Sequence, residues 1–445
     1  MKSTKIKFIN HASVVVSSEN ISILTDPWYS GGAFHKGWNL LFENSTEDIF
    51  ELLNHITHIW ISHEHPDHFS IPFFKKYGEL IRTNKITILF QMTFDQRVVS
   101  FLKANNFLVK EIPFEKKVSL DAKFNVYCIK DGFYDSALFI ENEEDRILNL
   151  NDCEINNKKR ALEIFELTGP VDVLLSQFSY AAWKGGKHNN KWRKNAAKDK
   201  IDTLKLQIRI FSPKVIIPFA SYIYFSNENN FYINDSVNTP KDIFDKVEED
   251  EVAMVVMKPN DVLDKIENVD VLSAINFWEE KYLAIKTNPL QSYRSVNFDE
   301  LKKVYLNYCD RICENNNIKL MKIVRLLSPV RVFKPVSILL EDTQEIIEFD
   351  YLAKRFFRSK NEPMLKMHSE SLLFLFQNSF GFDTLTVNGC FEECKRGGFT
   401  LASRSLAIEN LNNLGFHFNG SFLFKFRLIK MFLLRLYRVA RKIES

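Results

Sequence analysis

Cysteine is scarce in this sequence, and long apolar runs are missing from it. Six of the 445 residues are cysteine, fewer than a disulfide-stabilised secreted domain uses. Residues 1–10 contain no apolar stretch typical of a signal peptide. We also find no uninterrupted apolar run of about 20 residues, the length that a membrane-spanning helix needs. We therefore expect a reduced, cytoplasmic protein without a membrane-spanning helix.

An excess of charge of one sign is also missing. The formal net charge is +3, too small for the strong field that a nucleic-acid-binding protein presents. Hydrophobic residues make up 45% of the chain, which is typical of a folded protein with a sizeable core. We expect a small-molecule substrate and no nucleic-acid partner.

The first part of the chain alternates strand-like and helix-like segments. Short β-branched runs at residues 6–9, 12–17, 21–24 and 57–62 predict strands, and later runs predict strands at 86–90, 125–129, 137–141, 147–150, 171–175 and 215–218. Helical patterns cover residues 69–80, 94–104, 158–167 and 196–211. This alternation predicts a layered α/β domain.

Two domains are expected from the chain length, since one hydrophobic core rarely grows to this size. The boundary is predicted near residue 265, giving a catalytic domain over residues 1–265 and a C-terminal domain over 266–445. The second domain has a helix-prone segment at 296–316 and a strand-like segment at 330–347. Its role cannot be inferred from the sequence.

Residues 63–68, His-Glu-His-Pro-Asp-His, directly follow the predicted strand at 57–62. His63 and His65 are two residues apart on an extended segment, so they point to the same side, and Asp67 and His68 can turn back toward them. Imidazole nitrogen and carboxylate oxygen together suit Zn, Fe or Mn and leave positions open for water, as a catalytic site requires. The alternative is a set of surface histidines that cap a helix.

The surrounding segments resemble the metallo-β-lactamase superfamily. The resemblance covers about residues 5–235 and includes Asn10-His11, residues 26–38 and 60–68, Asp135-Ser136, residues 148–153 and 177–179, and residues 218–221. Within the superfamily, it is strongest to the catalytic region of CMP-N-acetylneuraminate hydroxylase-like and L-ascorbate-6-phosphate lactonase-like proteins. It implies a four-layer αββα sandwich with the metal site at one edge, to which we add a C-terminal α+β extension.

The same resemblance implies roles for the motif residues. His63 and His65 would hold one divalent metal ion, and Asp67 and His68 would hold a second. Asp152, at the end of an apolar strand, matches the carboxylate that bridges the two ions. Asp67 or Asp152 would also accept a proton during catalysis, whereas the neighbouring Cys153 is expected to be a buried apolar residue.

Two customary histidine ligands of the superfamily are absent, because no histidine lies between His68 and His188. Asp131 or Asp135 could replace the first of them. The second position falls at residues 218–221, which offer only the Ser221 hydroxyl, while His188 could reach the site from a polar loop. A ligand set with more oxygen favours one metal, or iron or manganese, over two tightly held zincs.

Three other residues are expected to support the metal site. His11 and His35 are interpreted as residues that contact the ligands or the substrate, and Asp26 as a buried carboxylate that orients a ligand. The pairs Cys309/Cys313 and Cys390/Cys394 have neither zinc-ribbon nor Rieske spacing, so a shared cysteine site is not favoured. Without a Rieske motif, oxygenase activity would require a separate electron donor.

The segment at residues 422–442 combines apolar residues with seven Lys or Arg, most of them on one face of a helix. It could pack on its own domain, or it could attach the protein peripherally to an anionic membrane surface.

Three functions remain open at this point. The leading hypothesis is a metal-dependent hydrolase, in which metal-activated water attacks an ester, lactone or phosphodiester. The second is an iron-dependent monooxygenase acting on a nucleotide sugar or glycan precursor. The third is a degenerate binding module that has lost catalysis. A phosphorylated metabolite or a nucleotide sugar is the expected kind of substrate.

Overall fold

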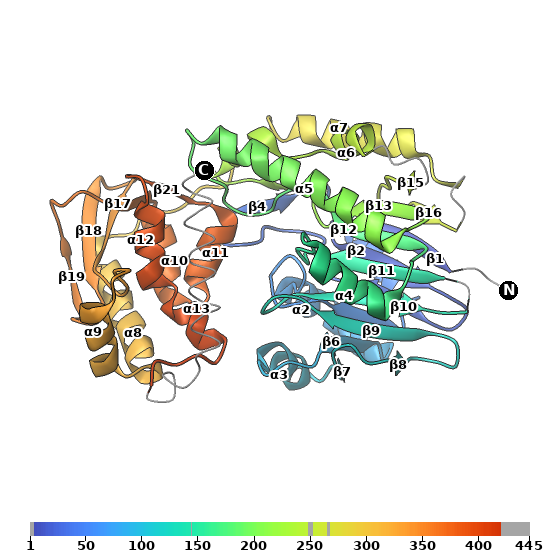
Figure 1. Ribbon diagram of the computed structural model, residues 1–445, viewed down its shortest axis with the longest axis horizontal. Helices are drawn as coiled ribbons and strands as arrows, with labels where there is room; N and C mark the ends of the chain where they lie inside the picture. The colour runs from blue at the N-terminus through green and yellow to red at the C-terminus, as the bar shows by residue number, and fades with distance from the viewer. Residues whose placement is uncertain (1–3, 144, 248–251, 265–267, 420–445) are drawn as a thin grey trace.

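The computed structural model describes residues 4–143, 145–247, 252–264 and 268–419, and Figure 1 shows its two parts. The N-terminal part contains two seven-stranded sheets. The first sheet runs in the order β16-β1-β2-β3-β5-β6-β7. Its strands are β1 (Lys5–Asn10), β2 (Ser13–Ser17), β3 (Ser22–Thr25), β5 (His58–Ile61), β6 (Thr87–Gln91), β7 (Leu108–Ile112) and β16 (Val262–Leu263).

The second sheet runs in the order β15-β13-β12-β11-β10-β9-β8. Its strands are β8 (Val118–Ser119), β9 (Asn125–Lys130), β10 (Ser136–Glu141), β11 (Arg146–Asn151), β12 (Val173–Gln177), β13 (Val215–Phe219) and β15 (Ala253–Met254). Buried side chains of both sheets, such as Phe8 and Leu138, belong to one apolar cluster. The sheets therefore pack face to face around a shared core.

Helices cover the outer face of each sheet (Figure 1). On the first sheet lie α1 (Thr46–Leu53), α2 (Ile71–Thr83) and α3 (Arg97–Ala104), whose apolar faces form a second core with its strands. On the second sheet lie α4 (Lys158–Thr168) and α5 (Asn190–Phe211). Helix α6 (Pro240–Lys246) contacts α7 (Val271–Ala284), whose Trp278 packs on Phe8 of β1. This arrangement is the predicted four-layer αββα sandwich.

The C-terminal part combines helices with a five-stranded sheet of order β19-β18-β17-β20-β21. Its strands are β17 (Val336–Leu340), β18 (Glu345–Asp350), β19 (Arg355–Arg358), β20 (Leu365–Met367) and β21 (Phe391–Glu393). Its helices are α8 (Phe298–Asn315), α9 (Ile318–Leu327), α10 (Ser369–Gln377), α11 (Gly381–Asn388), α12 (Gly398–Leu406) and α13 (Ile408–Asn413). The predicted α+β extension is confirmed, and the strand-like segment at 330–347 is the hairpin of β17 and β18.

A short ribbon joins the two parts. It consists of β4 (Trp38–Leu40) and β14 (Ile223–Phe225), which is followed by the 3-10 helix η1 (Phe231–Ser236). Side chains of the ribbon, such as Trp38 and Phe225, share a buried cluster with residues of the C-terminal part. The N-terminal part is therefore packed directly against the C-terminal part.

The core of the N-terminal part continues past the predicted boundary near residue 265. Trp278 and Ile285 lie in the cluster shared by the two large sheets, whereas Val296 lies in the cluster of the C-terminal part. The packing thus changes from one core to the other between Ile285 and Val296. The predicted helix at residues 422–442 lies outside the described residues. Among the helices that the structure describes, none is long and apolar enough to cross a membrane.

Candidate metal centre

The histidine cluster lies between β5 and α2, at the end of a buried strand. After His63, the carbonyl of His65 accepts hydrogen bonds from the amides of His68 and Phe69, at 3.0 and 2.7 Å. This tight turn brings His68 back beneath His63, with their ring centroids 4.3 Å apart. Helix α2 then begins with Ser70 as its N-cap, whose side chain accepts from the Phe73 amide. The local sequence therefore dictates the shape of the loop.

All five predicted metal-site residues lie together, and two further residues join them. The ligand atoms form three overlapping sets, each with its atoms within 4.8 Å of one another. The sets are His63 with His65 and Asp135, His63 with His68 and Asp152, and His11 with Asp67 and His68.

His68 belongs to two of these sets, and carboxylates lie beside both of its ring nitrogens. Its Nε2 lies 3.3 Å from Asp67 Oδ2 and 3.3 Å from Asp152 Oδ2. Its Nδ1 lies 3.1 Å from Asp26 Oδ2, and the other oxygen of Asp26 accepts from the Ser62 amide at 2.7 Å. Asp26 is therefore placed to orient the His68 ring from behind, as a partner of a metal ligand does.

The first vacant ligand position is covered by Asp135 and not by Asp131. Asp135 Oδ1 lies 3.7 Å from His63 Nε2, whereas Asp131 Oδ1 lies 3.8 Å from the guanidinium of Arg160. His11 also joins a candidate ligand set, because its Nε2 lies 3.4 Å from Asp67 Oδ2. This contact agrees with the predicted role of His11 as a residue that contacts a ligand.

His188 and Ser221 are the candidates that the sequence offers for the second vacant position. His188 is exposed in the turn before α5 and belongs to none of the ligand sets among the described residues. The Ser221 hydroxyl accepts hydrogen bonds from the amides of Phe178 and Ser179. His35 stacks on Phe374 at 4.1 Å, and burial lowers its pKa to about 4.

The cluster has the unsatisfied polar atoms that a bound cation would satisfy. His68 Nε2, Asp67 Oδ1 and His11 Nδ1 are buried and have no hydrogen-bond partner, although buried polar atoms are normally paired. The Nε2 of His63 also lies 2.8 Å from Nδ1 of His65, a close approach of two imidazoles. Because the donor set is nitrogen and carboxylate oxygen, these residues fit one or two divalent metal ions.

The charges and burial of this cluster shift the pKa values of its members in opposite directions. Burial lowers the pKa of His63, and the neighbouring His68 and His65 lower it further. Burial also raises the pKa of Asp135 to about 7. For His68, the attraction of Asp67, Asp152 and Asp26 outweighs burial and raises the pKa. His68 therefore holds its proton more tightly than His63 does. Metal binding would displace protons from the ligands of this cluster.

The C-terminal part contributes a residue that the sequence did not reveal. Asp383, in the first turn of α11, has its Oδ2 3.6 Å from His65 Nε2. Burial lowers the pKa of His65, but the hydrogen bond and charge of Asp383 outweigh it, with smaller contributions from Asp67 and Asp135, and the pKa rises to about 9. Only the packing of the two parts brings Asp383 to the site.

A cavity of about 880 Å³ opens beside His65. One wall comes from the N-terminal part, including residues 32–35, 64–66, 90–95 and 132–134. The other wall comes from α10, α11, α13 and the residues after α13. Because His65 and Asp383 both line it, the cavity gives a small molecule access to the candidate metal centre.

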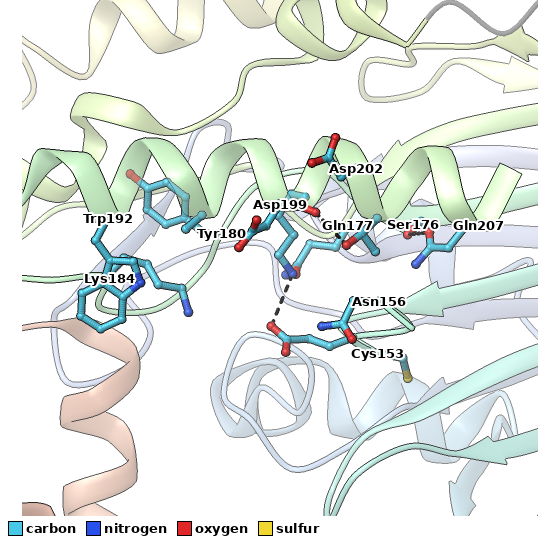
Figure 2. Close-up of a pocket in the computed structure, with 14 residues that line it drawn as sticks. Cys153, Asn156, Ser176, Gln177, Tyr180, Lys184, Trp192, Asp199, Asp202 and Gln207 are labelled. Carbon is cyan, nitrogen blue, oxygen red and sulfur yellow. Dashed lines mark hydrogen bonds and ion pairs between the residues drawn. The ribbon is translucent and has the colours of Figure 1, made fainter. Parts of the chain in front are cut away.

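A smaller cavity of about 320 Å³ lies along α5. Figure 2 shows Trp192, Asp199 and Asp202 on this helix, with Cys153 and Asn156 on the opposite side of the cavity. Gln177 connects it to the metal centre, since its Nε2 donates to Asp152 Oδ1 at 3.2 Å. Cys153 is buried, as predicted. The other four cysteines of interest, Cys309, Cys313, Cys390 and Cys394, are free thiols and belong to none of the described ligand sets.

Comparisons with known proteins agree with this picture. Residues 5–175 match the beta-lactamase superfamily domain. Cytidine monophosphate-N-acetylneuraminic acid hydroxylase of Danio rerio is 28% identical over 256 residues, 54% of this chain and 42% of that protein. The enzyme of Asterias rubens is 29% identical over 255 residues, 54% of this chain and 37% of that protein. The chain thus spans about two fifths of the length of these curated relatives.

Among solved structures, Igni18, a metallo hydrolase from Ignicoccus hospitalis, is similar with a TM-score of 0.41 and 16% identity. The match covers 59% of this chain and 97% of that one.

Proposed function

We propose that this chain, whose residues 5–175 form a beta-lactamase superfamily domain, is a metal-dependent hydrolase of a small-molecule ester, lactone or phosphodiester. One observation carries the proposal: four histidines and three aspartates converge where a large cavity reaches the end of β5. A mixed nitrogen and oxygen ligand set with an open side is typical of catalytic rather than structural metal sites.

The candidate ligands form two groups, each of which would hold one metal ion. His63, His65 and Asp135 would hold one, and His11, Asp67 and His68 would hold the other. Asp152, beside His63 and His68, would lie between them. Zinc, iron and manganese all accept such ligands. When bound, the metal supplies a water of lowered pKa and polarises a substrate oxygen.

The protein itself must orient the ligands and accept the proton. Asp26 fixes the His68 ring, and Asp383 contacts His65 from the opposite side of the cluster. Of the two predicted proton acceptors, the Asp67 side chain is 2% exposed and that of Asp152 is 20% exposed. We assign the proton transfer to Asp152, because its carboxylate can exchange the proton with solvent.

Hydroxylation is the second candidate, and the names of the curated relatives favour it. By this hypothesis, iron at the same site would support oxidation of a nucleotide sugar or related glycan precursor. The mixed ligand set of histidine nitrogens and aspartate oxygens is compatible with iron. A separate electron donor would have to supply the electrons. The degenerate binding module is less favoured, because Asp135 and His11 add two further residues to the candidate ligand sets.

Metal analysis of anaerobically purified protein, combined with activity assays, tests the proposal. The assays are hydrolysis of carboxylic esters, lactones and phosphodiesters, and oxygen uptake with CMP-sugars and a chemical reductant. Hydrolysis that is lost on chelation and restored by zinc or manganese is the expected result. Oxygen uptake that depends on iron, without hydrolysis, would establish the second candidate instead.

A further inference from the structure

Phenylalanine is the most frequent residue type in the lining of the cavity beside His65. Phe69, Phe90 and Phe101 face it from the N-terminal part, and Phe374, Phe380 and Phe416 face it from the C-terminal part. Apolar side chains therefore line both walls. Such a lining binds a ligand by removing apolar surface from water, and it offers a polar ligand few partners.

The charged side chains that line the cavity disfavour a phosphate ligand. Arg97 is held by Asp95, with Nε 2.8 Å from Oδ2, and also lies 3.7 Å from Glu64. Lys130 lies over the ring of Phe114 at 5.4 Å. Glu64, Asp95 and Asp383 line the same cavity. A phosphate would therefore meet these three carboxylates, while Arg97, one of the two cations, is already paired, which is unfavourable.

Two of the three amide side chains in the lining, Gln91 and Asn413, donate hydrogen bonds within the protein. Gln91 donates to the carbonyls of Ser62 and Tyr134, and Asn413 donates to the carbonyl of Ser379. Both amide hydrogens of Gln91 are therefore used within the cavity wall, and Asn413 binds the wall as well.

Large apolar side chains are exposed at the same cavity. Phe94 is 93% exposed and Met92 is 49% exposed; Ile71 and Phe380 are also exposed, and all four line this cavity. Exposed apolar side chains that gather in one place mark a ligand-binding surface more often than scattered ones do.

We propose that the cavity binds a long acyl chain, whose carbonyl end lies at the candidate metal centre while the chain extends between the two parts of the protein. A volume of about 880 Å³ is at the upper end of the range of about 300–1,000 Å³ for small-molecule pockets. It exceeds what a short acyl group can fill. The placement of a carbonyl end at the metal centre rests on the proposed hydrolysis. The binding of an acyl chain in the cavity does not depend on that proposal.

Binding of cis-parinaric acid, a fluorescent fatty acid, tests the acyl site without catalysis. The titration uses the full chain, once as purified and once after chelation, with dodecanoate, butanoate and CMP as competitors. Saturable binding that dodecanoate displaces, and that butanoate and CMP leave unchanged, is the expected result in both preparations.

A double variant, Phe94→Ser with Phe380→Ser, changes two exposed side chains of the cavity. We expect affinity to fall by about tenfold or more, because apolar surface at the binding site is lost. The matched control is Phe357→Ser, whose phenylalanine is 42% exposed on β19 and does not line the cavity. The control should bind as the wild type does.

The acyl site is wrong if no saturable binding occurs, if CMP displaces the probe while dodecanoate does not, or if the double variant binds like the control. Dodecanoyl and butanoyl esters of p-nitrophenol then test the hydrolysis separately. Acyl binding without turnover of either ester by the metal-loaded protein would leave the acyl site standing and reject the proposed hydrolysis.

Discussion

At the scale of single residues, His68 contacts three carboxylates of the candidate centre. Its Nδ1 faces Asp26 and its Nε2 faces Asp67 and Asp152. A carboxylate behind an imidazole fixes the tautomer and the direction of the ring, which leaves the opposite nitrogen for a metal. Asp26 is itself held by the Ser62 amide and by Asn151 Nδ2. The orientation of one ligand therefore depends on several residues that are not ligands.

Asp135 and Asp131 provide a matched test of the ligand set. Asp135→Asn should weaken metal binding about 10–100-fold or more, because an amide cannot replace a carboxylate that lies 3.7 Å from His63 Nε2. Asp131→Asn should leave metal affinity unchanged, since Asp131 pairs with Arg160. Titration of chelated protein with zinc, followed by calorimetry, measures both. Equal affinities for the two variants would remove Asp135 from the ligand set.

The sequence predicted these residues unequally, for physical reasons. His63, His65, Asp67 and His68 are neighbours on one turn, so local geometry alone brings them together. Asp135 was one of two alternatives, because the sequence could not show which carboxylate Arg160 neutralises. Asp383 was not predicted at all, because its place depends on how the C-terminal part packs.

At the scale of elements, hydrogen bonds between α11 and the loop before β4 connect the N-terminal part to the C-terminal part. Asn388, the last residue of α11, donates from Nδ2 to the carbonyl of Phe34 at 3.0 Å. Asn230 joins them by donating to the carbonyls of Gly37 and Asn388, at 2.8 and 2.7 Å. This interface positions Asp383 and closes one side of the cavity.

Gly37→Ala tests that interface, because a Cβ at residue 37 would lie 2.4 Å from Asn388 Cβ and 2.9 Å from the Phe34 carbonyl oxygen. We expect the free energy of unfolding to fall by about 1–3 kcal/mol, as overpacking usually costs. Gly186→Ala is the control, since its nearest neighbour, Glu392 Oε2, would be 3.6 Å away. Urea unfolding measures the free energy of unfolding of both variants. Equal values would show that the interface accommodates the extra methyl group without loss of stability.

The elements themselves were largely predictable. The predicted strands of both large sheets form with small shifts at their ends. Helix α5 begins at Asn190, before the predicted start at residue 196. Its first turn is capped by Asn189 and contains polar residues whose helical pattern is weak, so periodicity did not reveal it.

At the scale of the whole molecule, the fold and the site depend on different interactions. The described residues form three large apolar clusters, while the candidate ligands are a few polar residues at the end of the sandwich. Burial of apolar surface supplies most of the stability of a domain of this size. Loss of a ligand should therefore remove the metal and leave the fold.

Metal stoichiometry tests this account most directly. Wild-type protein, His65→Ala, Asp67→Ala and the control His188→Ala are purified under identical anaerobic conditions, and bound metal per chain is measured by elemental analysis. Far-ultraviolet circular dichroism confirms that each variant is folded. We predict that His65→Ala and Asp67→Ala lose most of their metal, whereas His188→Ala, whose histidine is exposed outside the cluster, keeps it. Wild-type stoichiometry in both ligand variants would contradict the assignment of the metal centre.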